Sequence, residues 1–192
     1  MPSVVDDPVV PAPAGPDRKK KSRSRRQLIE WGVVILAALV TALVLRISVV
    51  QAFSIPSISM EDTLLIGDRV LVNKLNKSVH RGDVIVFHRP PGEEAAAIKD
   101  LIKRVIALPG ETVSAVDGKL FINGKPLAEP YLEPGTQTVM ERPVTIPAGR
   151  YWVMGDNRTQ SRDSRFFGPI EKSLIIGHAF IRVWPPNRFG GI

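Results

Sequence analysis

Residues 31–45 form an unbroken run of fifteen residues without a charged side chain. Counting from Gln27 through Arg46 gives 20 residues, which is about the length that an α-helix needs to cross the hydrocarbon core of a bilayer. Arg46 stands at the far end, where its long side chain can extend to the membrane interface. We therefore predict a single transmembrane helix over residues 27–46.

The residues that precede this run fix the expected orientation. Residues 1–17 contain five prolines and little that could form a core, so we expect them to be disordered. A basic run with no acidic residue follows, made of Arg18, Lys19, Lys20, Lys21, Arg23, Arg25 and Arg26. Basic residues beside a span are retained in the cytoplasm. We therefore expect residues 1–26 to be a cytoplasmic tail, and residues 47–192 to lie on the extracytoplasmic face.

The net charge of +7 would also suit a protein that binds nucleic acid. Without the seven cations of the basic run, however, the chain has 19 basic and 19 acidic residues. A nucleic-acid-binding domain carries its cations across a folded face, so this distribution predicts no nucleic-acid partner.

Two other interpretations of the apolar run are a cleavable signal peptide and a buried helix of a soluble protein. A signal peptide has a shorter apolar core and a cleavage site of small residues, whereas this run is long and its exit reads Val-Gln-Ala-Phe-Ser-Ile. Clustered cations would be hard to explain beside a buried helix. Both alternatives are weaker than a membrane anchor.

The remainder of the chain alternates between strand and turn signals, with no long helical periodicity beyond a turn or two near Glu93–Lys99. The dipeptides Asp117-Gly118 and Asn123-Gly124 are typical of tight hairpin turns. β-branched and aromatic residues gather in segments 69–73, 83–87, 119–123, 150–154 and 175–184. The fold class is therefore predicted to be mainly β.

The sequence gives no support for a thiol nucleophile, a metal site or a Ser-His-Asp triad. The chain has no cysteine, which excludes a thiol nucleophile and disulfides. Its three histidines, His80, His88 and His178, show no metal-ligand spacing, and no Gly-x-Ser-x-Gly motif is present. A Ser-His-Asp triad is not excluded, although nothing supports one. We predict no cofactor and no metal.

A serine and a lysine remain as candidates for covalent catalysis. Ser57 and Ser59 follow the apolar exit, and in an extended segment residues i and i+2 point to the same side. One hydroxyl could then attack a carbonyl while the other stabilises the oxyanion. Lys103 stands among apolar neighbours, and burial would lower its pKa toward the range of a general base. The residues alone favour a simpler interpretation, in which this lysine extends into solvent from a strand edge.

Five segments, in order, resemble the signature segments of bacterial type I signal peptidases. The resemblance extends over about residues 27–190 when the anchor is included. The five segments are 56–64 (Pro-Ser-Ile-Ser-Met-Glu-Asp-Thr-Leu), 67–74, 81–87, 102–110 (Ile-Lys-Arg-Val-Ile-Ala-Leu-Pro-Gly) and 155–165 (Gly-Asp-Asn-Arg-Thr-Gln-Ser-Arg-Asp-Ser-Arg).

The resemblance implies a role for each matching residue. Ser59 would be the nucleophile and Lys103 its general base. Ser57 would complete an oxyanion hole with the main-chain N–H of Ser59, and Ser161 would orient the lysine amine through a hydrogen bond. Structural support by charge pairing is implied for Asp156, Asp163 and Arg165.

The resemblance also implies a fold and a task. It predicts a two-lobed antiparallel β ectodomain, with a smaller lobe inserted at about residues 112–149. The implied partners are exported preproteins, whose signal peptides are removed at the outer face of the cytoplasmic membrane, and the lipid bilayer. The substrate would bind as an added strand, with shallow apolar pockets for small side chains. No oligomeric state is indicated.

Three positions differ from the residues that are usual in the family. Ile58 stands where a small residue is common, Asp62 where proline is usual and Ala107 where glycine is usual. None of these positions carries a reacting group. Two alternatives stay open: a related Ser-Lys peptidase, such as a self-cleaving repressor or a dedicated processing enzyme, and a catalytically silent membrane-tethered binding protein.

Overall fold

The structure is a computed structural model. It describes the backbone of residues 18–76, 78–92 and 98–192, and the side chains of these residues except for 18–24 and 44–48. The chain separates into a helical unit that ends at Leu45 and a β-rich unit, Arg46–Ile192. The expected disorder of residues 1–17, the side chain of Arg46 and most of the helical turn expected near Glu93–Lys99 lie outside the described residues.

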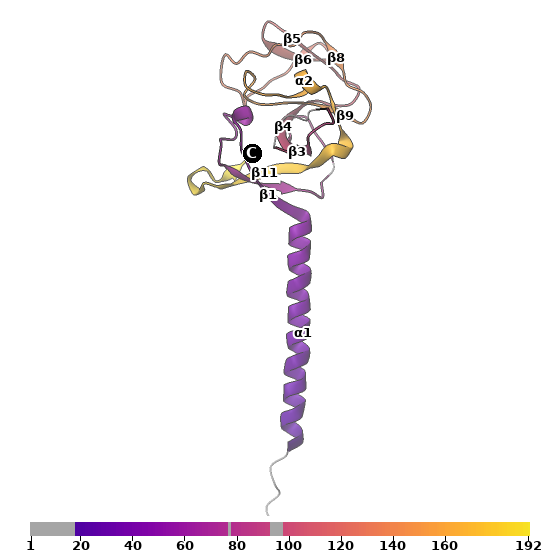
Figure 1. The fold of residues 1–192 in the computed structure, drawn as a ribbon, viewed down its shortest axis with the longest axis vertical. Helices are drawn as coiled ribbons and strands as arrows, with labels where there is room; N and C mark the ends of the chain where they lie inside the picture. Colours follow the sequence, from indigo (N-terminus) through magenta and orange to yellow (C-terminus); the bar gives the residue numbers. More distant parts are fainter. Residues whose placement is uncertain (1–17, 77, 93–97) are drawn as a thin grey trace, which may run out of the picture. The chain divides into compact units, whose positions relative to one another are not determined.

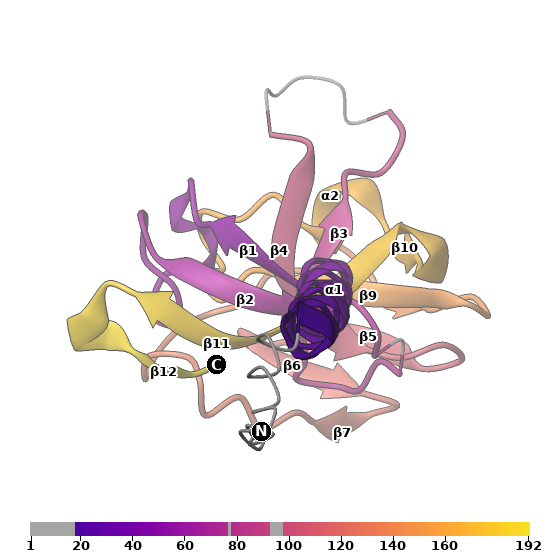
Figure 2. The ribbon, with the colours of Figure 1, turned by 90° about the horizontal axis from the view of Figure 1, so that it is seen from below.

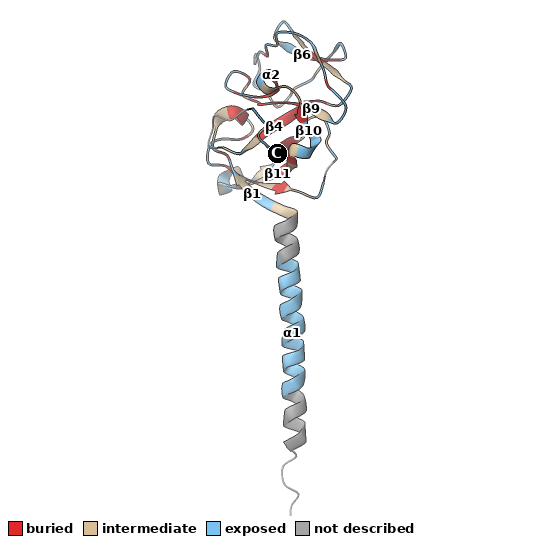
Figure 3. Cartoon of the chain, turned by 45° about the vertical axis from the view of Figure 1, so that its right-hand side comes forward, coloured by how far each residue is buried: buried red, intermediate tan, exposed pale blue. Residues whose placement is uncertain are grey.

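The helical unit holds most of α1, Arg18–Val49, and this helix contains the whole expected span (Figure 1). Its described side chains are exposed along the helix (Figure 3). The segment Arg25–Leu43 has a mean hydropathy of 1.6, and none of it is buried within the protein. A water-soluble protein would cover such an apolar surface. Length and composition therefore make α1 a candidate membrane span.

Most strands of the β-rich unit belong to one antiparallel sheet, in the order β1-β2-β11-β3-β4-β9-β10, with β12 paired to β11 (Figures 1 and 2). The bounds are β1 Val50–Ser54, β2 Arg69–Asn73, β3 Val84–His88, β4 Asp100–Ala107, β9 Arg150–Met154, β10 Ile170–Glu171, β11 Ile175–Trp184 and β12 Gly190–Gly191. Described helical segments after α1 are short, namely η1 Ile58–Met60, α2 Ser164–Phe167, η2 Lys172–Leu174 and η3 Pro186–Arg188.

A second antiparallel sheet has the order β7-β6-β5-β8. It comprises β5 Thr112–Val116, β6 Lys119–Ile122, β7 Lys125–Pro126 and β8 Val144–Thr145. Asp117 and Asn123 adopt φ angles of 49° and 51°, and each is followed by a glycine with positive φ. Positive φ at both central residues is the type I′ geometry that suits a hairpin, so both predicted turns are confirmed.

The mainly β prediction is confirmed. The strands expected at 69–73, 150–154 and 175–184 have those bounds, and the other two differ by one residue at their ends. The strand β1 was not among the predicted strands. It pairs along its length with β2, with Ala52 opposite Leu71.

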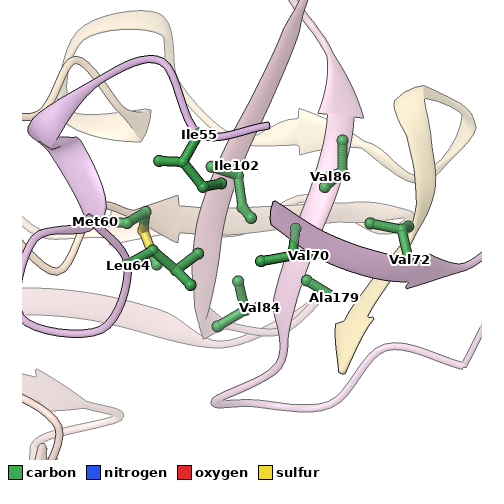
Figure 4. Close-up of a cluster of buried hydrophobic side chains, with 9 residues drawn as sticks. All are labelled: Ile55, Met60, Leu64, Val70, Val72, Val84, Val86, Ile102 and Ala179. Carbon is green, nitrogen blue, oxygen red and sulfur yellow. The ribbon is translucent and has the colours of Figure 1, made fainter. Parts of the chain in front are cut away.

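Buried apolar residues form three clusters. One lies beneath the turn η1 and is shown in Figure 4: Ile55, Met60, Leu64, Val70, Val72, Val84, Val86, Ile102 and Ala179. A second packs the four-stranded sheet against β4 and β9 through Ile106, Trp152 and Met154. The third lies around Ile85, Phe87 and Val105. The strands that carry the site are therefore fixed from several sides.

Candidate active site

Ser59 lies in a tight turn that its neighbours hold in place. Met60 and Leu64 are fully buried, and the backbone N–H of Leu64 donates to the carbonyl of Met60. Ser57 is extended, as expected, but Ser59 belongs to the 3₁₀ turn η1, so the prediction of one extended segment is wrong. The burial of Met60 explains the turn. The two hydroxyls still meet, with 3.3 Å between Ser57 Oγ and Ser59 Oγ.

Lys103 lies in the interior of the large sheet. It is on β4, which pairs with β3 on one side and β9 on the other, and only 3% of it is exposed. Its Nζ lies 2.6 Å from Ser59 Oγ and donates to the carbonyl of Ile102 at 2.9 Å. The interpretation of Lys103 as a solvent-directed residue at a strand edge is therefore wrong.

Burial lowers the pKa of Lys103 from 10.5 to about 8. The carboxylates of Asp163 and Asp156 oppose this shift, and the positive charge of Arg89 adds to it. At a pKa of about 8, roughly a tenth of the amines are neutral at pH 7. A neutral amine has a lone pair directed at its hydrogen-bond partner. The Ser59–Lys103 pair can therefore pass a proton from the hydroxyl to the amine.

Two buried carboxylates lie on the loop that follows β9. Asp156 forms a bidentate ion pair with Arg104 at 2.9 and 2.6 Å, and it also accepts a hydrogen bond from Thr63. Asp163 pairs with Arg165 and accepts from the backbone N–H of Gly155 at 3.0 Å. Both aspartates therefore take part in the charge pairing that the resemblance implied.

Ser161 is buried beside the nucleophile, but the hydrogen bond expected between it and Lys103 is not formed. Its Oγ has no hydrogen-bond partner among the described residues. The amine is engaged by Ser59 and the Ile102 carbonyl instead. A Cβ added at Gly155 would collide with Ser161 Oγ and with the carbonyl oxygen of Ser59, which shows how closely these groups pack.

We predict that Gly155→Ala lowers kcat for cleavage by on the order of 10²-fold, because the added methyl group must displace Ser59 or Ser161, and misplacements of about 1 Å cost rates of this size. Steady-state kinetics on a preprotein substrate would measure the loss. Gly190→Ala is the control, since a Cβ there meets no atom within 4 Å. Equal activity of the two variants would show that the packing at Gly155 does not matter.

Arg104, Arg158 and Thr63 were not predicted to belong to the site. Arg104 adjoins Lys103, yet both side chains are buried, on opposite faces of β4. Consecutive charged residues inside an apolar strand were a signal for the Arg104–Asp156 pair, because a buried charge requires a partner. Arg158 is 3% exposed and lies in the segment that matches the family, but its sequence gave no partner for it.

The described contacts of the histidines go to aspartates. His88 Nδ1 lies 2.8 Å from Asp100, and His178 Nδ1 lies 3.2 Å from Asp83. None of the hydrogen bonds described for the Ser59 hydroxyl involves a histidine. Within the described ranges, no group of three His, Asp or Glu residues is placed to hold a metal ion.

The three departures from the family pattern have different settings. Asp62 adopts a φ of 83°, which the ring of proline, with φ fixed near −65°, cannot adopt. The turn conformation seen here therefore excludes proline at position 62. Ala107 is fully buried opposite Trp152, at an irregularity between β4 and β9. Ile58 is half-buried between the two serines.

A serine hydroxyl hydrogen-bonded to a buried lysine amine defines the arrangement of a Ser-Lys peptidase. The profile of the family described as "Signal peptidase, peptidase S26" matches residues 28–184. The chain therefore belongs to the signal peptidase family, peptidase S26. It is a serine endopeptidase that acts on preproteins bearing signal peptides.

Individual relatives agree with this assignment. The chain is 38% identical over 196 residues to a signal peptidase I of Leptolyngbya laminosa, covering 99% of this chain and 96% of that one. It is 35% identical to the signal peptidase IB of Staphylococcus aureus, with coverages of 86% and 94%. A crystal structure of a signal peptidase I from Enterococcus faecalis is 32% identical, with a TM-score of 0.45, and covers 53% of this chain and 96% of that one. The family profile and the two relatives compared by sequence favour a signal peptidase over the repressor and silent-binder alternatives.

Proposed function

We propose that Ser59 is the nucleophile of signal-peptide cleavage and Lys103 its general base. The distance of 2.6 Å between Lys103 Nζ and Ser59 Oγ carries this proposal, because it is hydrogen-bonding distance for the proton that must move. The hydroxyl gives its proton to the neutral amine as Oγ bonds to the scissile carbonyl carbon. The resulting ammonium then protonates the leaving amine. A water molecule hydrolyses the acyl-enzyme by the same route.

The oxyanion formed in this step requires donors close to Ser59. The Ser57 hydroxyl and the backbone N–H of Ser59 would supply them, as the resemblance implies. Ser57 supports this role because its Oγ is 3.3 Å from Ser59 Oγ and the residue is only half-buried, so its hydroxyl can turn toward a bound carbonyl. Two such donors, preorganised before the reaction, stabilise the charge that develops on the carbonyl oxygen.

The remaining predicted residues would support the Ser-Lys pair. Asp163 binds the N–H of Gly155 and is itself held by Arg165, so it fixes the loop that packs against Ser59. Ser161 would rotate its hydroxyl toward the amine when substrate is bound, because it is buried and has no competing partner among the described residues.

We infer that the substrate adds a strand at the exit from the anchor. β1 pairs with β2 along one side only and forms the end of the described sheet. Its outer backbone groups are thus available to a peptide, and the chain leads from β1 directly to Ser57 and Ser59. Small side chains at the positions one and three before the cut would face the apolar residues around η1, where the bulk of Ile58 would narrow the space for them.

We propose that α1 spans the cytoplasmic membrane, with residues 1–26 inside and residues 47–192 outside. The apolar segment Arg25–Leu43 and the cations that precede it support this topology. In the same scheme, residues 112–149 form an inserted lobe, which is supported by the separate sheet of β5 to β8. Anchoring would hold enzyme and membrane-bound preprotein in one layer and raise their effective concentration.

We predict that protease added to intact spheroplasts digests residues beyond about 50 and spares an epitope tag at the amino terminus. A quantitative immunoblot against the tag and against the carboxyl-terminal region would measure the survival of the tag and the digestion of the β-rich unit. Detergent-permeabilised spheroplasts, in which the tag must also disappear, are the control. Protection of the β-rich unit in intact spheroplasts would overturn the proposed orientation.

A further inference from the structure

Arg158 is a buried cation whose partners come from a distant part of the chain. Its side chain is fully buried, and its Nε donates to the carbonyl of Gly155 at 3.0 Å. Its Nη2 donates to Glu129 Oε1, and its Nη1 donates to Thr138 Oγ1. All three guanidinium nitrogens therefore have partners, as a buried arginine requires.

Glu129 and Thr138 lie in the connection between β7 and β8, within the segment that carries the second sheet. Arg158 lies on the loop after β9, which belongs to the large sheet. Thr138 is itself 2% exposed, and its backbone N–H donates to the carbonyl of Gly118 in the first hairpin of the second sheet. These contacts therefore tie the 127–143 connection to the loop that follows β9.

A second link runs parallel to the first. The Tyr131 hydroxyl donates to Glu129 at 2.7 Å, and the guanidinium carbon of Arg104 lies 3.9 Å from the centroid of the Tyr131 ring. Arg104 in turn forms the bidentate pair with Asp156. Burial, followed by the Glu129 charge, raises the pKa of Tyr131, so its hydroxyl stays a donor. Glu129 thus contacts the loop through one direct ion pair and one aromatic bridge.

Gly155 connects this network to the site. Arg158 holds the carbonyl of Gly155, while Asp163 holds its N–H. On the side where a side chain would project, Gly155 packs closely against Ser161 Oγ and the carbonyl of Ser59, so no methyl group would fit. Asn157, on the same loop, donates its N–H to the Ser59 carbonyl at 3.2 Å. A shift of Gly155 would therefore displace Ser59, whose hydroxyl is hydrogen-bonded to the Lys103 amine.

We propose that Glu129 and Thr138 are positioning residues for cleavage, which act through Arg158 and Gly155 on the geometry of Ser59. The proposal rests on the roles proposed above for Ser59 and Lys103. It makes the segment between β7 and β8 part of the catalytic apparatus, although none of its residues contacts a reacting atom. Loss of Glu129 leaves the buried Arg158 charge uncompensated, and loss of the Thr138 hydroxyl leaves one of its buried N–H groups unpaired. In either case the loop relaxes away from the nucleophile.

The matched pair Thr138→Val and Thr138→Ser gives the most direct test. Valine keeps the shape of threonine and removes the acceptor for Arg158, whereas serine keeps the hydroxyl. We expect Thr138→Val to lower kcat by about 10-fold with KM within about twofold, which is the pattern for a loss specific to the transition state. Thr138→Ser should restore kcat to within about threefold of the parent chain.

A double-mutant cycle tests the ion pair. Glu129→Gln alone is expected to lower kcat more than Thr138→Val does, since it removes the charge that compensates Arg158. Adding Glu129→Gln to Arg158→Met should lower kcat no further, because the partner is already absent. Glu171→Gln is the control: it breaks the exposed pair with Arg150 at 2.7 Å and should leave kcat unchanged.

Thermal unfolding and the pH profile of kcat/KM separate positioning from mere folding. A displaced loop moves Asp163 relative to Lys103, so the apparent pKa of the profile should shift in Thr138→Val but not in Glu171→Gln. Folded Thr138→Val and Glu129→Gln variants with the parent kcat and profile would overturn the inference. Such a result would leave the Ser59 assignment intact, because that assignment depends on the separate loss of activity in Ser59→Ala.

Discussion

Ser59→Ala is expected to abolish cleavage of a preprotein, with a loss in kcat on the order of 10⁴-fold or more, as for other removed serine nucleophiles. The variant deletes the oxygen that lies 2.6 Å from the Lys103 amine, so no atom remains that can form the acyl-enzyme. A preprotein cleavage assay followed by gel electrophoresis measures the loss. The fold should persist, since Met60 and Leu64 rather than Ser59 anchor the turn.

Ser57→Ala is the matched comparison, because it removes the neighbouring hydroxyl from the same segment. We expect a decrease of about 10²–10³-fold, the usual effect of deleting one oxyanion donor. Circular dichroism and thermal unfolding should show both variants folded. Full activity of Ser59→Ala would refute the nucleophile assignment, and complete loss in both variants would contradict the distinct roles given to the two serines.

Local signals predicted the parts of the fold that depend on neighbouring residues. Asn123-Gly124 and Asp117-Gly118 specify their own turns, because asparagine, aspartate and glycine tolerate positive φ at small cost. The strand Arg69–Asn73 was predicted from its β-branched residues Val70 and Val72, which are both buried in the structure. The edge strand β1 was missed because its apolar residues continue the run of α1, and only pairing with β2 distinguishes them.

In the site, too, features that depend on neighbouring residues were predicted, and features that depend on distant residues were not. Ser59 and Lys103 were chosen as candidates because their segments resemble a known family, but the buried position of Lys103 was not predicted. Apolar neighbours are compatible with both an edge and an interior strand, and the choice depends on β9, which lies more than 40 residues further along the chain. The turn at Ser59 likewise depends on the burial of Met60 beneath it.

Partners of buried charges were the least predictable feature. The pair formed by Glu129 and Arg158 joins residues 29 positions apart, and the pair formed by Arg104 and Asp156 joins residues 52 positions apart. A sequence shows that such charges exist but not which of them meet. The rule that a buried charge requires a partner indicates that one must be found, and only the three-dimensional arrangement identifies it.

Lys103→Arg is expected to be inactive, since a guanidinium stays protonated and cannot accept the Ser59 proton. In the parent chain, burial lowers the pKa of Lys103 to about 8. The amine is therefore charged and inactive below this pH and neutral and active above it, so kcat/KM should rise with pH through an apparent pKa of about 8. Lys103→Met should be equally inactive and remain folded, because it replaces a buried amine by an apolar side chain of similar shape.

A histidine base would give a different profile. The rise would then occur near pH 6–7, and replacement of His80, His88 or His178 would abolish cleavage. The structure argues against this, because the contacts described for these three rings go to Asp83 and Asp100. We would measure initial rates of peptide cleavage between pH 5 and 10 for the parent chain, Lys103→Arg and the three histidine variants. These rates distinguish a lysine base from a histidine base. Activity in Lys103→Arg, together with its loss in one histidine variant, would refute the Ser-Lys mechanism.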